Sequence, residues 1–382
     1  MKKESLGILA ISLTSGGAEK VISLLLKKLI NDYEVTLFLF YNEIHFPIPN
    51  GVRLVYFSEY IPKKRIALLR FWDFVSFARK YHLNLKRYDI HFAISFLAFP
   101  NLLSGLLSIW HTKRVFIISE RGFPSDNTTS KLSLYISKLF YPLLYNRCTK
   151  LFSNSVHINK DLMENFRITI PMHVIYNPIE IPKTTRLPES YIEPKSSYKI
   201  INVGTLNERK NQSMLLDALK ELPGDKYALT ILGGGHLKSD LETNIRTLQL
   251  EGQVLLAGKV KNVGEYLLKN DCFVLSSFTE GFPNALLEAM SYGLPCISTN
   301  CLSGPLELLN ENETVTIKKG QFLPVKYGIL INNNDHMALS GAISYLMNNP
   351  ERQVHYSKMS IERSKNYALA TIYKQFKTFI HS

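Results

Sequence analysis

Short apolar runs alternate along the whole chain with longer segments that have helical periodicity. The first half contains runs rich in Val, Ile and Phe, which we expect to form strands at residues 5–12, 34–41, 52–57, 91–97, 114–120, 151–155 and 172–176. A second series of expected strands lies at residues 200–204, 227–232, 254–258, 272–277, 295–299 and 327–331. Strands that alternate with helices form parallel sheets, so the pattern predicts an α/β protein with two Rossmann-like, doubly wound domains.

A proline-rich stretch separates the two series of strands. Its sequence, NPIEIPKTTRLPESYIEPKSSYKI, contains four prolines and interrupts any periodicity. We therefore expect an N-terminal domain at residues 1–180, a linker at 181–199 and a C-terminal domain at 200–360. Residues 361–382 are expected to form a helix that packs back toward the N-terminal domain. Ligands bind at the carboxyl ends of parallel strands, so the two domains are expected to face one another across a cleft.

The longest run without a charged side chain spans residues 90–112 and is long enough to cross a bilayer. It contains two histidines, a proline and an asparagine, so we interpret it instead as a strand at 91–97 followed by a buried helix at 101–110. The first residues, MKKES, lead directly into a short strand and lack the features of a signal peptide.

Composition and charge narrow the class of protein. The 382 residues are 46% hydrophobic and 20% charged, as in ordinary globular proteins, and four cysteines at unrelated spacings predict neither a disulfide framework nor a zinc site. The net charge is +13, and residues 1–180 carry 23 Lys and Arg against 13 Asp and Glu, a difference of +10. The partner of the first half is therefore expected to be anionic.

The stretch TEGFPNALLEAMSYG at residues 279–293 contains the most informative chemistry. Glu280 is expected in the loop after a strand, and Glu288 in a helix that begins near Pro283. Free N–H groups at a helix start favour phosphate, so the two carboxylates suit the two ends of a nucleotide sugar whose diphosphate lies between them. The alternative is a helix-capping Glu280 with Glu288 on a solvated helix face.

With these motifs in view, the chain resembles a GT-B glycosyltransferase of the retaining family 4 type over nearly its whole length. Glu280 and Glu288 match the family's E-x7-E motif, and VGTLNERKNQ at 203–212 resembles its cation-bearing segment. Further resemblances are LTSGGAEKV at 13–21, VIYNPIEI at 174–181, ILGGGHLKSDLE at 231–242 and CLSGPLELL at 301–309. Two positions depart from the family: Thr205 stands where many members have Arg, and Arg121 where many have a histidine that contacts the donor sugar.

The resemblance implies roles for particular residues. Glu280 and Lys210 would be the catalytic pair, with Glu280 holding hydroxyls of the transferred sugar. Glu288 would accept the ribose hydroxyls. The implied donor-binding set is Gly16, Gly17, Arg209, Lys210, Gly281, Phe282, Pro283, Asn284 and Glu288.

The implied reaction retains the configuration at the sugar by displacement on the same face. The leaving diphosphate takes the acceptor proton, and Lys210, Arg209 and helix amides neutralise its charge. The chain has no Asp-x-Asp pair, and its ten histidines show no ligand spacing, so we expect no catalytic metal and no cofactor besides a nucleotide-sugar donor, expected to be UDP-linked.

Residues 61–87 combine eight Lys and Arg with one Asp and a cluster of aromatic residues. Such a helix can lie on an anionic bilayer, with Lys63, Lys64, Arg65 and Trp72 as the expected contacts. The alternative is a core-facing helix with a solvated basic edge. Nucleic acid is disfavoured as a partner because no nucleic-acid-binding module accompanies the charge.

The sequence therefore predicts a retaining glycosyltransferase that moves a hexose or N-acetylhexosamine from a nucleotide sugar to a polyprenyl-diphosphate-linked saccharide. It would act in bacterial surface glycan assembly, in the cytoplasm, attached peripherally to the inner face of the membrane. Two alternatives stay open at this point: a non-catalytic GT-B subunit that binds sugar nucleotides or serves as a scaffold, and a sugar-nucleotide epimerase.

Overall fold

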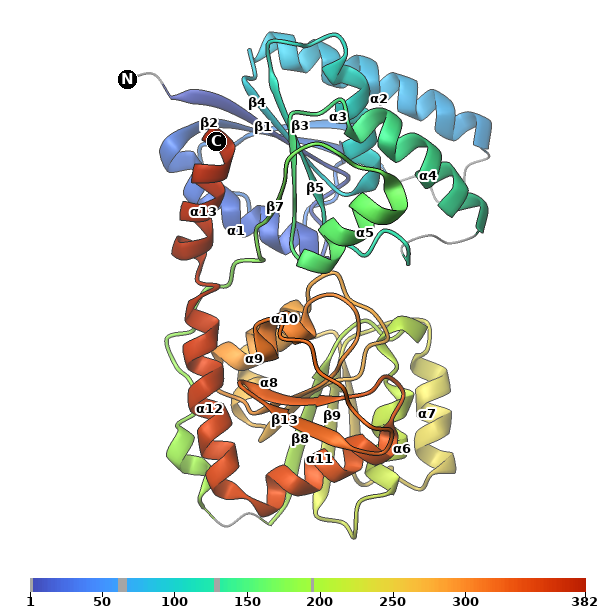
Figure 1. The fold of residues 1–382 in the computed structure, drawn as a ribbon, viewed down its shortest axis with the longest axis vertical. Helices are drawn as coiled ribbons and strands as arrows, with labels where there is room; N and C mark the ends of the chain where they lie inside the picture. Colours follow the sequence, from blue (N-terminus) through green and yellow to red (C-terminus); the bar gives the residue numbers. More distant parts are fainter. Residues whose placement is uncertain (1–2, 61–66, 127–130, 194–195) are drawn as a thin grey trace. The chain divides into compact units, whose positions relative to one another are not determined.

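The computed structural model describes residues 3–60, 67–126, 131–193 and 196–382. The chain divides into two compact units, one formed by Met1–Pro178 together with Leu369–Ser382, and the other by Ile179–Ala368 (Figure 1). We call them unit 1 and unit 2. The stretch 181–199, expected as a linker, belongs to unit 2 and carries the short 3-10 helix η1 (Pro188–Tyr191).

Unit 1 is built on a parallel seven-stranded sheet with the order β3-β2-β1-β4-β5-β6-β7. Apolar runs that lie between two helix layers produce these strands, and β1 and β4 are buried along most or all of their length. The strands are β1 (Glu4–Ala10), β2 (Tyr33–Tyr41), β3 (Arg53–Ser58), β4 (Phe92–Phe96), β5 (Val115–Glu120), β6 (Lys150–Ser153) and β7 (Met172–Val174). The parallel, doubly wound sheet expected for the first half of the chain is thus confirmed.

Two hydrophobic cores flank this sheet because successive side chains of a strand point to opposite faces. Leu6 and Ile8 of β1 belong to one core, which is covered by α1 (Gly17–Asp32) and α13 (Leu369–His381). Leu9 belongs to the other core. The helices over that second face are α2 (Ala67–Arg87), α3 (Ala98–Ser108), α4 (Lys131–Tyr145) and α5 (Val156–Phe166).

The uncharged run at residues 90–112 forms strand β4 and helix α3, so the expected strand and helix are confirmed. Of the helices within the described ranges, none has the length and apolarity that crossing a membrane requires.

Helix α2 contains the described part of the basic, aromatic segment. It buries Phe77, Tyr81 and Leu85, which are spaced by four residues and so share one side of the helix, while Trp72 and Val75 are 60% and 40% exposed. Lys63, Lys64 and Arg65 lie outside the described residues.

Unit 2 contains a second seven-stranded sheet with the order β10-β9-β8-β11-β12-β14-β13. Its strands are β8 (Tyr198–Val203), β9 (Tyr227–Leu232), β10 (Val254–Gly258), β11 (Cys272–Leu275), β12 (Cys296–Thr299), β13 (Phe322–Val325) and β14 (Gly328–Ile331). Six strands follow the predicted series. The seventh, β13, was not predicted and pairs antiparallel with β14 at the sheet edge. Pro324 lies within β13, and an edge strand tolerates it because one side of its backbone needs no sheet partner.

Helices surround the sheet of unit 2 and complete its core. They are η2 (Glu208–Lys210), α6 (Ser213–Lys220), α7 (Lys238–Thr247), α8 (Val263–Leu268), α9 (Asn284–Ser291), α10 (Pro305–Asn310), α11 (His336–Asn348) and α12 (Pro350–Lys365). The end of the chain therefore forms two helices, of which α12 belongs to unit 2 and α13 to unit 1.

Candidate functional site

The carboxyl ends of β8 and β11, neighbours in the sheet of unit 2, carry the candidate site. Helix η2 follows β8, and a loop at residues 276–283 follows β11. Two hydrogen bonds join them: the Ser276 hydroxyl donates to the carbonyl of Lys210 at 2.7 Å, and the Phe278 amide donates to the carbonyl of Arg209 at 2.8 Å. The Asn207 side chain caps η2 by accepting from the Lys210 amide at 3.2 Å.

This arrangement brings together the two residues predicted to be catalytic. Nζ of Lys210 lies 2.5 Å from Oε1 of Glu280, and the Ser277 hydroxyl donates to the same oxygen at 2.6 Å. The side chains are 14% and 5% exposed for Lys210 and Glu280, respectively. A carboxylate in this position is held by one ion pair and one hydrogen bond, and Lys210 retains a small accessible surface.

The surroundings of Glu280 keep its carboxylate ionised. Burial alone raises the pKa of Glu280, but the ammonium of Lys210, the Ser277 hydroxyl and the more distant charge of Arg209 together lower it below its usual value. The carboxylate is therefore charged at neutral pH, and the ion pair with Lys210 is intact. Arg209, beside Lys210 on η2, is exposed.

The side chain of Glu280 is buried, although the residue lies in the loop after β11. The structure covers it with the segment after β12: Thr279 forms a bridge with Leu302, and the Glu280 amide donates to the Leu302 carbonyl at 3.4 Å. Close contact continues at Gly304, where φ is +102° and a Cβ would lie 2.3 Å from Cδ of Pro283. Pattern analysis does not detect a loop that folds over another loop.

Glu288 lies on α9, which has Pro283 as its N-cap residue. Asn284, Glu288 and Tyr292 are spaced by four residues and are all half-buried, whereas Leu286, Leu287, Ala289 and Met290 are buried. Glu288 therefore belongs to the more accessible side of the helix. Gly281, Phe282 and Pro283 are buried, and the centroid of the Phe282 ring lies 5.8 Å from that of Tyr367, so the side chain of Phe282 supports the loop from within.

Gly16 and Gly17 lie in unit 1, where Gly16 is the N-cap residue of α1. The carboxylate of Glu19 folds back over this helix start, and a Cβ at Gly16 would lie 2.2 Å from its Oε2. Burial raises the pKa of Glu19, although a backbone hydrogen bond and Thr14 oppose the shift. A ligand anion at this helix start would have to displace Glu19 or meet it in its protonated form.

Arg121, which follows β5 and departs from the family pattern, is buried, and so is Glu120, the last residue of β5. The Arg121 guanidinium is buried over the rings of Phe96 and Phe152 and donates to Oδ1 of Asn177 at 2.9 Å. Burial lowers its pKa to about 9. Glu120 is buried beside it and accepts from the Tyr145 hydroxyl at 3.0 Å, and burial raises the pKa of Glu120 to about 7.

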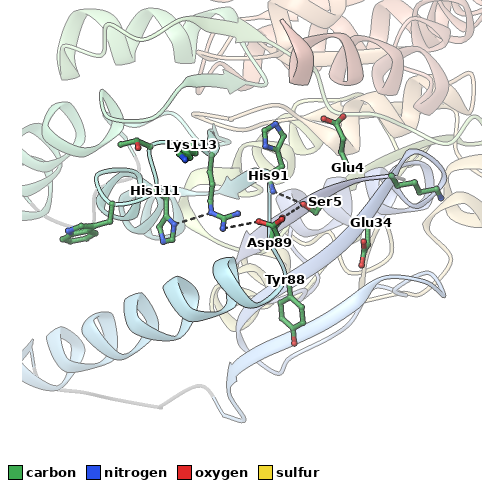
Figure 2. A pocket seen from close by; sticks show the side chains of 12 residues that line it. Glu4, Ser5, Glu34, Tyr88, Asp89, His91, His111 and Lys113 are labelled. Atoms are coloured by element: carbon green, nitrogen blue, oxygen red, sulfur yellow. Dashed lines mark hydrogen bonds and ion pairs between the residues drawn. The ribbon is translucent and has the colours of Figure 1, made fainter. Parts of the chain in front are cut away.

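Figure 2 shows a pocket of about 590 Å³ in unit 1 that is unrelated to these residues. It is lined by Ser5 at the start of β1, by His91 just before β4 and by Arg114 just before β5, so it lies at the amino ends of the strands. Its polar groups are largely engaged with one another: Arg114 pairs with Asp89 at 3.6 Å, and the His91 amide donates to Ser5 at 3.0 Å. Parallel sheets bind ligands at the opposite edge, so we do not assign the active site here.

Within the described ranges, no group of three or more His, Cys, Asp or Glu residues could hold a metal ion. Sequence analysis missed Ser276 and Ser277, which position η2 and Glu280. Two small hydroxyl residues directly after a buried apolar strand were the available signal, since such residues follow the carboxyl end of the strand where ligands bind.

Comparison with known proteins identifies the family to which the chain belongs. The family model described as Glycosyl transferases group 1 matches residues 183–363. An uncharacterized glycosyltransferase of Methanocaldococcus jannaschii is 30% identical over 305 residues, covering 73% of this chain and 74% of the relative. A second relative, from Campylobacter jejuni, is the N-acetylgalactosamine-N,N'-diacetylbacillosaminyl-diphospho-undecaprenol 4-alpha-N-acetylgalactosaminyltransferase. It is 28% identical over 366 residues, which cover 95% of this chain and 96% of the relative.

Among solved structures, Anabaena HepE in complex with UDP and glucose is similar, with a TM-score of 0.76, 15% identity and 99% coverage of both chains. At that identity the likeness concerns the fold. The expected GT-B fold class, with two Rossmann-like domains, is confirmed.

Proposed function

Because the chain belongs to the family of glycosyl transferases group 1, we propose that it transfers a sugar from a nucleotide-sugar donor to a saccharide linked to a polyprenyl diphosphate. The observation that carries the proposal is the buried ion pair between Lys210 and Glu280 at the carboxyl edge of the unit 2 sheet. A scaffold subunit has no need for an ionised pair in that position.

In this proposal Lys210 neutralises the diphosphate of the donor, with help from Arg209 and from the amides at the start of α9. Lys210 and Ser277 both donate to Oε1 of Glu280. We therefore assign Oε2 to the hydroxyls of the transferred sugar. Glu288, on the accessible side of α9, accepts hydrogen bonds from the ribose hydroxyls. Gly16 and Gly17 of α1 bind donor phosphate after Glu19 moves away.

The reaction that we propose retains configuration at the sugar. The bond between the sugar C1 and the diphosphate oxygen breaks, a bond from C1 to the acceptor oxygen forms on the same face, and the acceptor proton passes to the leaving phosphate. The protein positions both partners and stabilises the departing negative charge. No step requires a metal ion.

The donor and acceptor classes are supported by relatives. HepE was solved with UDP and glucose, and the Campylobacter jejuni enzyme is named for N-acetylgalactosamine transfer to a diphospho-undecaprenol saccharide. We therefore propose a UDP-hexose or UDP-N-acetylhexosamine donor. A lipid-linked acceptor requires a membrane, and we propose that the reaction takes place at its cytoplasmic face. The basic segment 61–87 would attach there through Lys63, Lys64, Arg65 and Trp72.

The test is a panel of nucleotide sugars incubated with the full chain, with and without a polyprenyl-diphosphate disaccharide, and scored by nucleotide release and by product mass. We expect release that depends on the acceptor, together with a product heavier by one sugar residue. Lys210→Met should abolish release, whereas Lys220→Met, which removes an exposed cation at the end of α6, should leave it unchanged.

Two results would contradict the proposal. A changed sugar nucleotide formed without acceptor would indicate an epimerase. Binding of nucleotide sugars without turnover under any acceptor condition would indicate a non-catalytic subunit.

A further inference from the structure

Helix α4 exposes an apolar side to solvent. Five large hydrophobic residues of this helix are 44–72% exposed, namely Tyr135, Ile136, Leu139, Phe140 and Leu143. At 100° per residue they form a continuous stripe, and Tyr141 and Tyr145, which are buried, lie on the opposite side. A surface helix ordinarily presents polar residues outward, so α4 has the composition of a helix that is covered on both sides.

The stripe belongs to a well-packed helix. Gly105 of α3 approaches so closely that a Cβ there would lie 2.2 Å from the carbonyl oxygen of Leu144. The ring of Tyr141 stacks on that of Tyr145 at 4.5 Å and on that of Phe166 at 5.2 Å. Because the inner side of α4 is held in this way, the outward side chains keep their orientation without a partner protein.

The charges within the segment that contains the stripe are of one sign. From residue 127 to residue 150 the sequence contains four Lys or Arg and no Asp or Glu. Of these, Lys138 and Arg147 are exposed, whereas Lys150 is buried. An apolar stripe with cations beside it complements the interface of an anionic bilayer, where aromatic and aliphatic groups enter and basic groups contact lipid phosphates.

We propose that the outward side of α4 inserts into the interface of an anionic membrane, and that it provides the apolar part of the enzyme's attachment to its lipid-linked substrate. This inference rests on the proposed function for the identity of the substrate. Helix α2 covers the same sheet face (Figure 1). It adds Trp72 and Val75, whose side chains are 60% and 40% exposed.

A second copy of the chain is the competing occupant. In a symmetric dimer the same patch meets itself, so Lys138 and Arg147 of both copies would approach one another with no acidic residue of α4 to pair with. Like charges at such an interface oppose association, whereas anionic lipid headgroups neutralise them.

The test is co-flotation of the full chain with vesicles of phosphatidylglycerol and phosphatidylcholine or of phosphatidylcholine alone. The variant carries Leu139→Asn and Leu143→Asn. Its matched control carries Leu187→Asn and Leu255→Asn, which alter exposed leucines of unit 2. We expect the α4 variant to lower the partition coefficient on anionic vesicles by about tenfold or more, and the control to leave it unchanged. High salt should weaken binding of the parent without abolishing it.

Each possible outcome bears on the proposal. Equal flotation of parent and α4 variant, or no flotation of either, would overturn it, as would a parent dimer that the variant converts to a monomer without a change in flotation. Nucleotide release with a detergent-solubilised acceptor is measured on the same proteins and should be equal for all of them. If the parent releases no nucleotide but floats with anionic vesicles and the α4 variant does not, the proposed function is contradicted while α4 is still supported as a membrane-binding surface.

Discussion

Lys210 and Glu280 are seventy residues apart in sequence, and their contact explains why both can be largely buried and charged. Each ion neutralises the other at 2.5 Å, and Ser277 adds a hydrogen bond to the carboxylate. Removing one partner leaves a charge with little water around it, which costs more than the intact pair contributes. The site therefore depends on both residues for its chemistry and on each for the other's orientation.

Glu280→Gln should separate these two roles. The amide has nearly the same shape and can keep a hydrogen bond to Ser277, but it removes the charge beside Lys210. We expect nucleotide release to fall by about 10²–10³-fold, because an electrostatic group at the reacting centre is lost. The free energy of unfolding should fall by about 1–3 kcal/mol, measured by urea titration.

Glu251→Gln removes an exposed carboxylate of the same unit and serves as the control. Wild-type turnover in Glu280→Gln would show that this carboxylate does not act on the sugar.

Glu120 should make stability depend on pH. Burial raises its pKa from 4.5 to about 7 in the folded protein. As pH rises from 4.5 toward 7, the unfolded chain releases this proton while the folded chain keeps it, so the unfolded state is favoured. The contribution of Glu120 to the free energy of unfolding is therefore present in full below pH 4.5 and is lost as pH rises to and past 7. The loss amounts to at most about 3 kcal/mol.

Glu120→Gln removes this titration and keeps a group that can bond to Tyr145. Urea unfolding of parent and variant between about pH 5 and 8 should therefore show a steeper loss of stability in the parent. Parallel curves would mean that Glu120 titrates at its ordinary pKa.

At the scale of elements, the helix layer over unit 1 is set by close backbone approach as much as by apolar packing. Gly105 lets α3 lie directly against α4, and this contact holds the outward side of α4 where solvent or lipid meets it. The neighbouring α2 buries Phe77, Tyr81 and Leu85 on one side and exposes basic residues such as Arg79, Lys80 and Lys86.

Gly105→Ala should push α3 and α4 apart. The added methyl group would meet a backbone oxygen, which cannot rotate away, so we expect a loss of about 1–3 kcal/mol in the free energy of unfolding. Gly252→Ala is the matched control, because a Cβ there has no neighbour within 4 Å. The two variants are compared by thermal and urea unfolding, and equal stability would contradict the close approach.

At the scale of the whole molecule, the chain leaves unit 1 after Pro178 and returns to it at Leu369. The returning helix α13 buries Ile372, Phe376, Phe379 and Ile380 in the core beside α1. Its last carbonyls accept from the buried ammonium of Lys150, at 3.2 Å for Ile380 and 2.8 Å for Ser382. Unit 1 is thus completed by residues that are synthesised after unit 2.

Deletion of residues 369–382 should unfold unit 1 and spare unit 2. Four buried apolar side chains contribute about 2 kcal/mol each, and their sum of about 8 kcal/mol is comparable to the whole stability of a domain. We expect protease digestion of the deletion variant to leave a resistant fragment within residues 179–368. A resistant fragment from unit 1 would contradict this expectation.

Turnover by the full chain should survive EDTA. In the proposed mechanism Lys210 and helix amides stabilise the diphosphate, so removal of divalent ions leaves the protein's contribution intact. Nucleotide release is measured before and after chelation. Loss of release with EDTA and its recovery with Mg²⁺ or Mn²⁺ would show that a metal ion takes part.

The sequence by itself determined the architecture and the elements on which the candidate site residues lie. Apolar runs of strand length, spaced by amphipathic helices, specify parallel sheets because each side chain's burial follows from local periodicity. Thirteen of the fourteen strands were predicted in this way. The motif at residues 279–293 likewise located Glu280 after a strand and Glu288 on a helix, since loop and helix signals are local.

Only the tertiary structure decided what surrounds these residues. The burial of Glu280 results from a loop some twenty residues later in the chain, and its pairing with Lys210 results from the neighbouring positions of β8 and β11 in the sheet. Tertiary contacts also decided that Arg121 bonds to Asn177 and that the apolar stripe of α4 faces outward. Such features depend on contacts between distant segments, and these contacts leave no periodic signal in the sequence because neither partner's local pattern records where the other lies.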